Sequence, residues 1–185
     1  MKALFFLYDG YVDWEISPLS YMLSVSDIDV KTVALTEEIT HEGKFRIKPD
    51  FRIEECDPTH YDVLIIPGGT PAPLDKEERL LNFIRRFDEQ GKYIAAICGA
   101  PTFLAAAGIL RERKYSTSID EPEYQHYFDE TFKSEADVTI SENVITAEGN
   151  AYIEFGIAVG KELKIFDDRE DELETILFFK NQLRS

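Results

Sequence analysis

A chain of 185 residues is long enough to bury one sizeable hydrophobic core and short for two. Its formal net charge of −16 argues against nucleic acids and anionic membranes as partners, because both carry negative charge of their own. With 44% hydrophobic and 30% charged residues, and without repeats or low-complexity tracts, the composition is that of an ordinary globular protein, and we expect a single domain over residues 1–185.

The beginning of the chain and its cysteines bear on location. The first apolar run, from Lys2 to Leu7, is too short and too soon interrupted for a signal peptide, and no stretch approaches the length that spans a membrane. Two cysteines in unlike contexts do not indicate a disulfide framework. We therefore expect a protein of the reducing cytoplasm.

Segments typical of buried strands alternate with segments typical of helices along the chain. Strands are predicted at residues 2–7, 29–35, 61–67, 93–98 and 144–147, with a small hairpin over 44–53 that is broken at Pro49-Asp50. Helices are predicted at residues 13–26, 76–90, 151–163 and 170–183, with a helix of small residues ending at Gly108 and a short one at 121–128. Such alternation implies a mainly parallel sheet that helices cover on both faces.

Two of the predicted helices carry more specific expectations. Pro18 should lie in the first turn of the first helix or kink it, because proline lacks the N–H that a helix interior needs. The last helix should bury an apolar face, which consists of Leu173, Ile176, Leu177 and Phe179.

Polar residues or glycines follow three of the predicted strands. Asp9-Gly10 and then Glu15 follow the first strand, Gly68-Gly69 follow the third, and Cys98 ends the fourth. In a parallel sheet, binding and catalytic sites form beyond the carboxyl ends of the strands. We therefore expect these residues to converge on one site.

Cys98 lies where an apolar strand meets a helix, with Ala96 and Ala100 two residues to either side. A sharp strand-to-helix turn needs small side chains at those positions, and this is the arrangement of a nucleophile elbow with cysteine in place of serine. The first free N–H groups of the following helix would then favour the thiolate, which is the reactive form. The alternative is a small buried hydrophobe, which is how we interpret Cys56.

Three segments resemble the ThiJ/PfpI superfamily, which has the class I glutamine amidotransferase-like fold and includes intracellular proteases and amidases. They are residues 9–15, 62–69 and 95–101, and their order and spacing match over residues 1–163. The resemblance implies a flavodoxin-like three-layer sandwich, an α/β fold with a mainly parallel sheet and a nucleophile elbow, commonly assembled as a homodimer. It also implies that Cys98 is the nucleophile.

The resemblance further implies that Glu15 hydrogen-bonds the sulfur of Cys98. An ionised glutamate beside a thiolate would raise both pKa values by repulsion, whereas a protonated Glu15 would donate to the thiolate and stabilise it. We expect the pair to share one proton across neutral pH. The alternative for Glu15 is an exposed carboxylate in the first turn of a helix.

Gly68 and Gly69 stand where this family has the loop on the oxyanion side of its site. Without side chains, their backbone can approach a reacting carbonyl group, and the N–H groups of Gly69 and Gly99 could hold a developing oxyanion. A Pro-Gly-Gly turn would place glycines there in any case.

The sequence departs from the family at the general base. Gly99 stands where members that act as proteases have a histidine directly after the cysteine, and Ser118 stands where a deglycase-like branch has one. His126 and Asp120 are the candidates for the missing third group, although an exposed helical residue is the simpler interpretation of His126.

The remaining histidines, His41 and His60, precede strands and are expected at the surface. No group of side chains has the spacing of a metal site, and the sequence has no glycine-rich phosphate loop. We therefore expect no metal and no cofactor.

These observations favour a cysteine-dependent hydrolase or amidase-like enzyme that acts on a small electrophilic molecule, such as an aldehyde or a thioester. Efficient proteolysis is not expected, because the leaving amine must be protonated and the usual histidine is missing. One alternative is a redox-responsive, stress-protective protein that senses oxidants through Cys98. Another is the isonitrile-hydratase-like branch, which also lacks the histidine but usually has aspartate at the position of Glu15. A protein that only binds a ligand is the least favoured alternative, because it would make no use of a nucleophile elbow.

Overall fold

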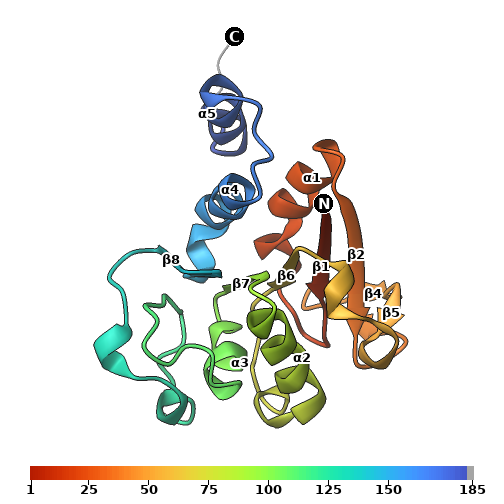
Figure 1. Ribbon diagram of the computed structural model, residues 1–185, viewed down its shortest axis with the longest axis vertical. Helices are drawn as coiled ribbons and strands as arrows, with labels where there is room; N and C mark the ends of the chain where they lie inside the picture. The colour runs from red at the N-terminus through yellow and green to blue at the C-terminus, as the bar shows by residue number, and fades with distance from the viewer. Residues whose placement is uncertain (183–185) are drawn as a thin grey trace.

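The predicted strands come together in one seven-stranded sheet (Figure 1). The computed structural model describes residues 1–182. In spatial order the strands are β5 (Phe51–Arg52), β2 (Asp29–Ala34), β1 (Lys2–Phe6), β6 (Val63–Ile66), β7 (Tyr93–Ile97), β9 (Val144–Ala147) and β8 (Val138–Ser141). Neighbouring strands are parallel except β8, which pairs antiparallel with β9. The expected mainly parallel α/β fold is confirmed.

Helices cover both faces of this sheet (Figure 1). One layer holds α1 (Ser17–Val25) and α4 (Tyr152–Glu162), which pack against each other, and the other holds α2 (Glu78–Glu89) and α3 (Pro101–Ala106). Because both faces are covered, the central strands are continuously apolar, and every residue of β6 is buried. The helix α2 adds an apolar face to the core, formed by Leu80, Leu81, Phe83, Ile84 and Phe87.

The strand order reverses beside β1. The chain moves from β1 to β2 on one side, and β6 later pairs with β1 on the other side. At such a point the loops that follow the two strands diverge and leave a crevice at their carboxyl ends. The segments after β1, β6, β7 and β9 start at this edge, so the topology gathers Glu15, Gly68, Cys98 and Gly149.

The first helix begins later than predicted. Residues 13–15 form a separate 3-10 turn, η1 (Asp13–Glu15), and α1 starts at Ser17. Pro18 lies in the first turn of α1, where the N–H that it lacks would have no partner within the helix. The separate turn leaves the side chain of Glu15 buried instead of on an exposed helix face.

The predicted hairpin over residues 44–53 is wrong. β4 (Arg46–Ile47) pairs with β3 (Ile39–Thr40), whereas β5 joins the main sheet parallel to β2. The physical reason lies at Pro49-Asp50. Proline has no N–H for a ladder, and the Asp50 carboxylate accepts the N–H of Thr32 at 2.8 Å and its hydroxyl at 2.7 Å, which anchors the next residues beside β2.

A long excursion over residues 111–137 separates α3 from β8. The short helix predicted at 121–128 is reduced there to a 3-10 turn, η5 (Gln125–Tyr127). The excursion closes on itself at Tyr115, whose N–H donates to the carbonyl of Phe132 at 3.1 Å and whose carbonyl accepts the N–H of Ser134 at 2.8 Å.

The last helix, α5 (Arg169–Phe179), lies beyond α4 on the side away from the sheet (Figure 1). Its predicted apolar face is only partly buried, because α5 packs on the outer helices α1 and α4. Leu173 is 53% exposed, and the half-buried side chains are Ile176, Leu177 and Phe179. The end of the predicted helix, residue 183, lies outside the described residues.

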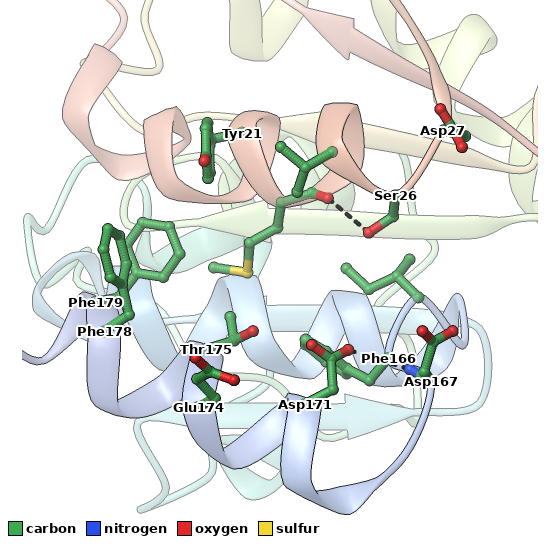
Figure 2. Close-up of a pocket in the computed structure, with 13 residues that line it drawn as sticks. Tyr21, Ser26, Asp27, Phe166, Asp167, Asp171, Glu174, Thr175, Phe178 and Phe179 are labelled. Carbon is green, nitrogen blue, oxygen red and sulfur yellow. Dashed lines mark hydrogen bonds between the residues drawn. The ribbon is translucent and has the colours of Figure 1, made fainter. Parts of the chain in front are cut away.

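A groove of about 600 Å³ runs between α1 and α5 (Figure 2). Aromatic side chains such as Tyr21 and Phe178 line it together with carboxylates such as Asp171. None of its lining residues comes from the strand ends that carry the predicted site.

Within residues 1–182, no helix combines the length and the apolar character needed to cross a membrane.

Replacing Phe87 with Ala should lower the free energy of unfolding by about 3–5 kcal/mol, because the fully buried ring would leave a cavity between α2 and the sheet. Phe45→Ala is the matched control, since that ring is 72% exposed and its loss should change stability by about 0.5 kcal/mol or less. Urea unfolding followed by circular dichroism measures both changes. Equal losses in the two variants would contradict this assignment of the core.

Candidate active site

Cys98 follows β7 in a backbone conformation that residues with side chains rarely adopt. Its φ angle is +64°, in the left-handed region, which costs about 1–3 kcal/mol for a residue other than glycine. The N–H of Cys98 donates to the carbonyl of Ala147 at 2.8 Å. The carbonyl of Cys98 accepts the N–H of Ser118 at 3.1 Å and the hydroxyl of Thr117 at 2.8 Å. These bonds hold the sharp strand-to-helix turn that the sequence predicts.

Glu15 reaches the same point from the loop after β1. Its side chain is buried, with 1% exposure, and its Oε2 accepts the N–H of Gly68 at 2.7 Å. The carbonyl of Gly68 in turn accepts the N–H of Val12 at 2.9 Å, so the loops after β1 and β6 are clamped together. Glu15 is therefore not the exposed first-turn carboxylate of the alternative interpretation.

Two glycines make room for the sulfur and the carboxyl group. A Cβ on Gly68 would lie 2.5 Å from Cys98 Cβ and 2.5 Å from Glu15 Oε2. A Cβ on Gly149 would lie 2.9 Å from Cys98 Sγ and 3.1 Å from Glu15 Oε1. Any side chain at either position would thus push the thiol and the carboxyl group apart. Sequence reasoning misses Gly149, whose one signal is its place directly after the late strand.

The sulfur and the carboxyl group are coupled through one proton. Burial raises the pKa of Glu15, while hydrogen bonds from Cys98 and from the Gly68 N–H lower it in part. Burial, followed by the negative charge of Glu15, raises the pKa of Cys98 to about 12. Because the pKa of each group is raised, the pair holds at least one proton near neutral pH, which the thiol and the carboxyl group share.

The helix after the turn, α3, spans six residues, Pro101–Ala106, and the effect of its dipole is confined to its first turn. One amide does act on the sulfur, since a hydrogen bond from the N–H of Gly99 lowers the pKa of Cys98 against the larger effect of burial. The N–H of Gly69 finds no acceptor within residues 1–182, and Gly69 and Gly99 are in contact. The backbone of Gly69 therefore lies beside Gly99, the residue that follows Cys98.

Ser118 approaches the sulfur from the segment after α3. Its hydroxyl donates to Glu148 Oε2 at 2.7 Å and accepts the N–H of Gly149 at 2.8 Å. A hydrogen bond from Ser118 also lowers the pKa of Cys98. Sequence reasoning places Ser118 at the position of the missing histidine but assigns no role to it or to Glu148. The two residues are 30 positions apart, and only the fold brings them together.

The structure does not bring His126 or Asp120 to Cys98. His126 is exposed and lies against Tyr127, with ring centroids 3.9 Å apart, in a cavity of about 300 Å³ that no residue of the Cys98 site lines. Asp120 is also exposed, and within residues 1–182 no hydrogen bond joins its carboxylate to Cys98. Both residues belong to the excursion, whose contacts with Cys98 come instead from Thr117 and Ser118.

The other histidines and the second cysteine lie outside the site. His60 is exposed as expected, but His41 is buried with 3% exposure, because its ring packs against Phe45 and its Nδ1 accepts the N–H of Gly43 at 3.0 Å. Cys56 is buried, and burial raises its pKa. Among residues 1–182, no three His, Cys, Asp or Glu side chains group together as metal ligands would.

A cysteine on a left-handed turn beside a buried glutamate, both at the carboxyl ends of parallel strands, defines an α/β protein of the nucleophile-elbow class. The model of the DJ-1/PfpI family matches residues 1–162, and the chain belongs to that family. The resemblance to the ThiJ/PfpI superfamily is thereby confirmed.

Relatives of the chain match most of its length. The Uncharacterized protease YoaZ of Bacillus subtilis (strain 168) is 32% identical over 179 residues, which cover 89% of this chain and 84% of the relative. Deglycase PfpI of Pyrococcus furiosus is 29% identical over 121 residues, which cover 64% of this chain and 73% of the relative. The crystal structure of the thiJ/pfpI family protein from Bacillus anthracis has a TM-score of 0.84 at 29% identity and covers 97% of this chain and 91% of its own.

Replacing Glu15 with Gln should lower the pKa of Cys98 from about 12, because it removes the buried negative charge beside the sulfur. Alkylation of Cys98 by iodoacetamide near pH 8 should then accelerate, by about tenfold for each unit by which the pKa falls. Mass spectrometry of the alkylated peptide over a range of pH measures the rate, and Cys56 in the same samples serves as the internal control. Slower alkylation in Glu15→Gln would instead show that a protonated Glu15 stabilises the thiolate.

Proposed function

We propose that this protein is a cysteine-dependent hydrolase in which Cys98 bonds to the carbonyl carbon of a small electrophilic substrate. The observation that carries the proposal is a half-buried thiol that lies beside a buried carboxyl group at a glycine-lined strand edge. A thiol with a base in hydrogen-bond reach is an activated nucleophile. The relatives are named protease and deglycase, which are names of enzymes, and this supports the same role.

Glu15 is the base of the first step. As Cys98 Sγ attacks, the S–C bond forms, the thiol proton passes to Glu15, and the π electrons of the carbonyl group move to its oxygen. The N–H of Gly99, which acts on the sulfur, and the N–H of Gly69, whose backbone lies beside Gly99, are the groups that would stabilise that oxygen anion. Glu15 then gives its proton to the leaving group. The raised pKa of Glu15 suits its role as the base, because a carboxylate of higher pKa takes up a proton more readily.

The surroundings of the sulfur favour small and reactive substrates. The groups that face Cys98 are Glu15, Ser118 and the glycines, and no basic side chain contacts the sulfur within residues 1–182. Peptide hydrolysis requires protonation of the leaving amine, which is a poor leaving group. The thiolate of a thioester and the alkoxide of an activated ester leave more readily, and addition to an aldehyde expels no group at all. We therefore favour aldehydes, activated esters and thioesters over peptides.

Cys98→Ser should reduce turnover of methylglyoxal and of p-nitrophenyl acetate to the uncatalysed rate, a fall of at least about 100-fold, because a serine hydroxyl is a much weaker nucleophile than a thiol with the same base. Cys56→Ser is the matched control and should retain full activity. Substrate loss and p-nitrophenol absorbance measure the two reactions. Undiminished turnover of both compounds by Cys98→Ser would refute the proposed function.

The redox-responsive alternative requires a thiolate at neutral pH, and the raised pKa of Cys98 works against it. After mild peroxide treatment near pH 7, we therefore expect little sulfinate at Cys98, and no more than a few-fold preference over the buried Cys56. Mass spectrometry of the two cysteine peptides measures the gain of oxygen. Rapid and selective gain of two oxygens at Cys98 would favour the redox role over catalysis.

A further inference from the structure

The hydroxyl of Ser118 hydrogen-bonds the Glu148 carboxylate and the N–H of Gly149. The sulfur of Cys98 lies on the same side, since a Cβ on Gly149 would come within 2.9 Å of it. A serine hydroxyl has one proton to donate and two lone pairs with which to accept. The N–H of Gly149 takes one lone pair, so the second remains available. The single proton can point to Glu148, as in the structure, or to the sulfur. Ser118 is therefore a bridge between the nucleophile and a carboxylate.

Glu148 has the properties of a terminal proton acceptor. Within residues 1–182, its carboxylate forms no ion pair and accepts only the Ser118 hydroxyl. Glu148 is half-buried and Ser118 is exposed, so water reaches both. Glu15 differs in each respect, because it is 1% exposed and bonded to the N–H of Gly68. A sealed carboxylate can exchange a proton with the thiol beside it but cannot readily activate a water molecule.

We propose that Ser118 and Glu148 form a hydroxyl–carboxylate relay that activates the water which releases the product from Cys98. The proposal rests on the function proposed above and deepens it, since it divides the proton transfers between two carboxylates. Ser118 contacts the attacking water, and Glu148 is a positioning residue that accepts the proton through Ser118. The relay occupies the place of the histidine that the sequence lacks.

The release step balances in atoms and protons. Acylation of Cys98 leaves a thioester, R–CO–S–Cys98. The oxygen of water bonds to the carbonyl carbon, its proton passes to Ser118 Oγ, and the proton of Ser118 passes to Glu148. The C–S bond then breaks, and the proton returns from Glu148 through Ser118 to the sulfur. The products are a carboxylic acid, the thiol of Cys98 and the original carboxylate of Glu148.

The test uses p-nitrophenyl acetate, which acylates a nucleophilic cysteine and releases coloured p-nitrophenol. Glu148→Gln should release the first equivalent as fast as the unaltered protein, because Glu15, Cys98 and Ser118 are intact. Ser118→Ala should slow it only a few-fold, because the variant also loses the bond that lowers the pKa of Cys98. Later turnovers should slow by about 100-fold, at the lower end of the contribution of positioned proton transfer. Acetyl-Cys98 should accumulate in mass spectra, and hydroxylamine, which attacks the thioester without a base, should restore turnover.

Control variants separate a chemical role from a structural one. Ser118→Thr keeps the hydroxyl and should restore most of the steady-state rate, whereas Ser24→Ala and Glu135→Gln change exposed residues away from the site and should change nothing. Unchanged steady-state turnover in both Ser118→Ala and Glu148→Gln would overturn the relay alone. An unaltered protein that releases p-nitrophenol no faster than Cys98→Ser would overturn the proposed function and the relay together.

Discussion

The left-handed backbone of Cys98 is the constraint on which the site depends. In an extended conformation, Cys98 would continue β7 and its sulfur would pack within the layers as Ile97 does. The strain of about 1–3 kcal/mol is matched by three hydrogen bonds to Ala147, Thr117 and Ser118, each of which contributes about 0.5–1.5 kcal/mol. Strand β9 and the segment after α3 therefore both hold the turn at Cys98. The same segment delivers the hydroxyl of Ser118 to the sulfur.

Two carboxylates near one sulfur have different surroundings, and this difference gives them different chemistry. Glu15 is sealed by the loops after β1 and β6, so burial raises its pKa and its exchange is with the thiol. Glu148 is open to water and reaches the sulfur only through Ser118. Pairs of acids whose environments differ in this way commonly divide the proton transfers of a reaction. The glycines at 68 and 149 permit the arrangement because they leave no side chain between the groups.

The parts of the fold that sequence predicts well are those whose signal is local. The inner strands β1, β6 and β7 are mainly apolar runs, and Glu15, Gly68 and Cys98 are recognisable because each directly follows such a run or its loop. The antiparallel edge strand β8 is missed, since only alternate residues face the core and Ile140 is 46% exposed. The hairpin over 44–53 fails because Asp50 binds a residue far away in the sequence.

From the sequence, the chemistry of the site is harder to predict than the identity of the residues that form it. The position of the shared proton depends on the N–H of Gly68, which reaches Glu15 only after β1 and β6 have paired. The hydrogen bond between Ser118 and Glu148 likewise joins two distant segments, one after α3 and one after β9. No sequence pattern links these two segments. His41 has polar neighbours in the chain but aromatic neighbours in space, and for this reason it is buried against expectation.

The excursion between α3 and β8 has a narrow neck. Tyr115 bonds the backbone of Phe132 and Ser134, and the Ser116 hydroxyl donates to the carbonyl of Ala136 at 2.6 Å. Beyond this neck, Thr117 and Ser118 still belong to the site, but residues 120–123 are exposed. This exposed segment can change in length at little cost, because closing a loop of twice the length costs only about 0.6 kcal/mol more. Insertions there would leave the thiol, Ser118 and the two carboxylates in place, as a graft site for new substrate preferences would require.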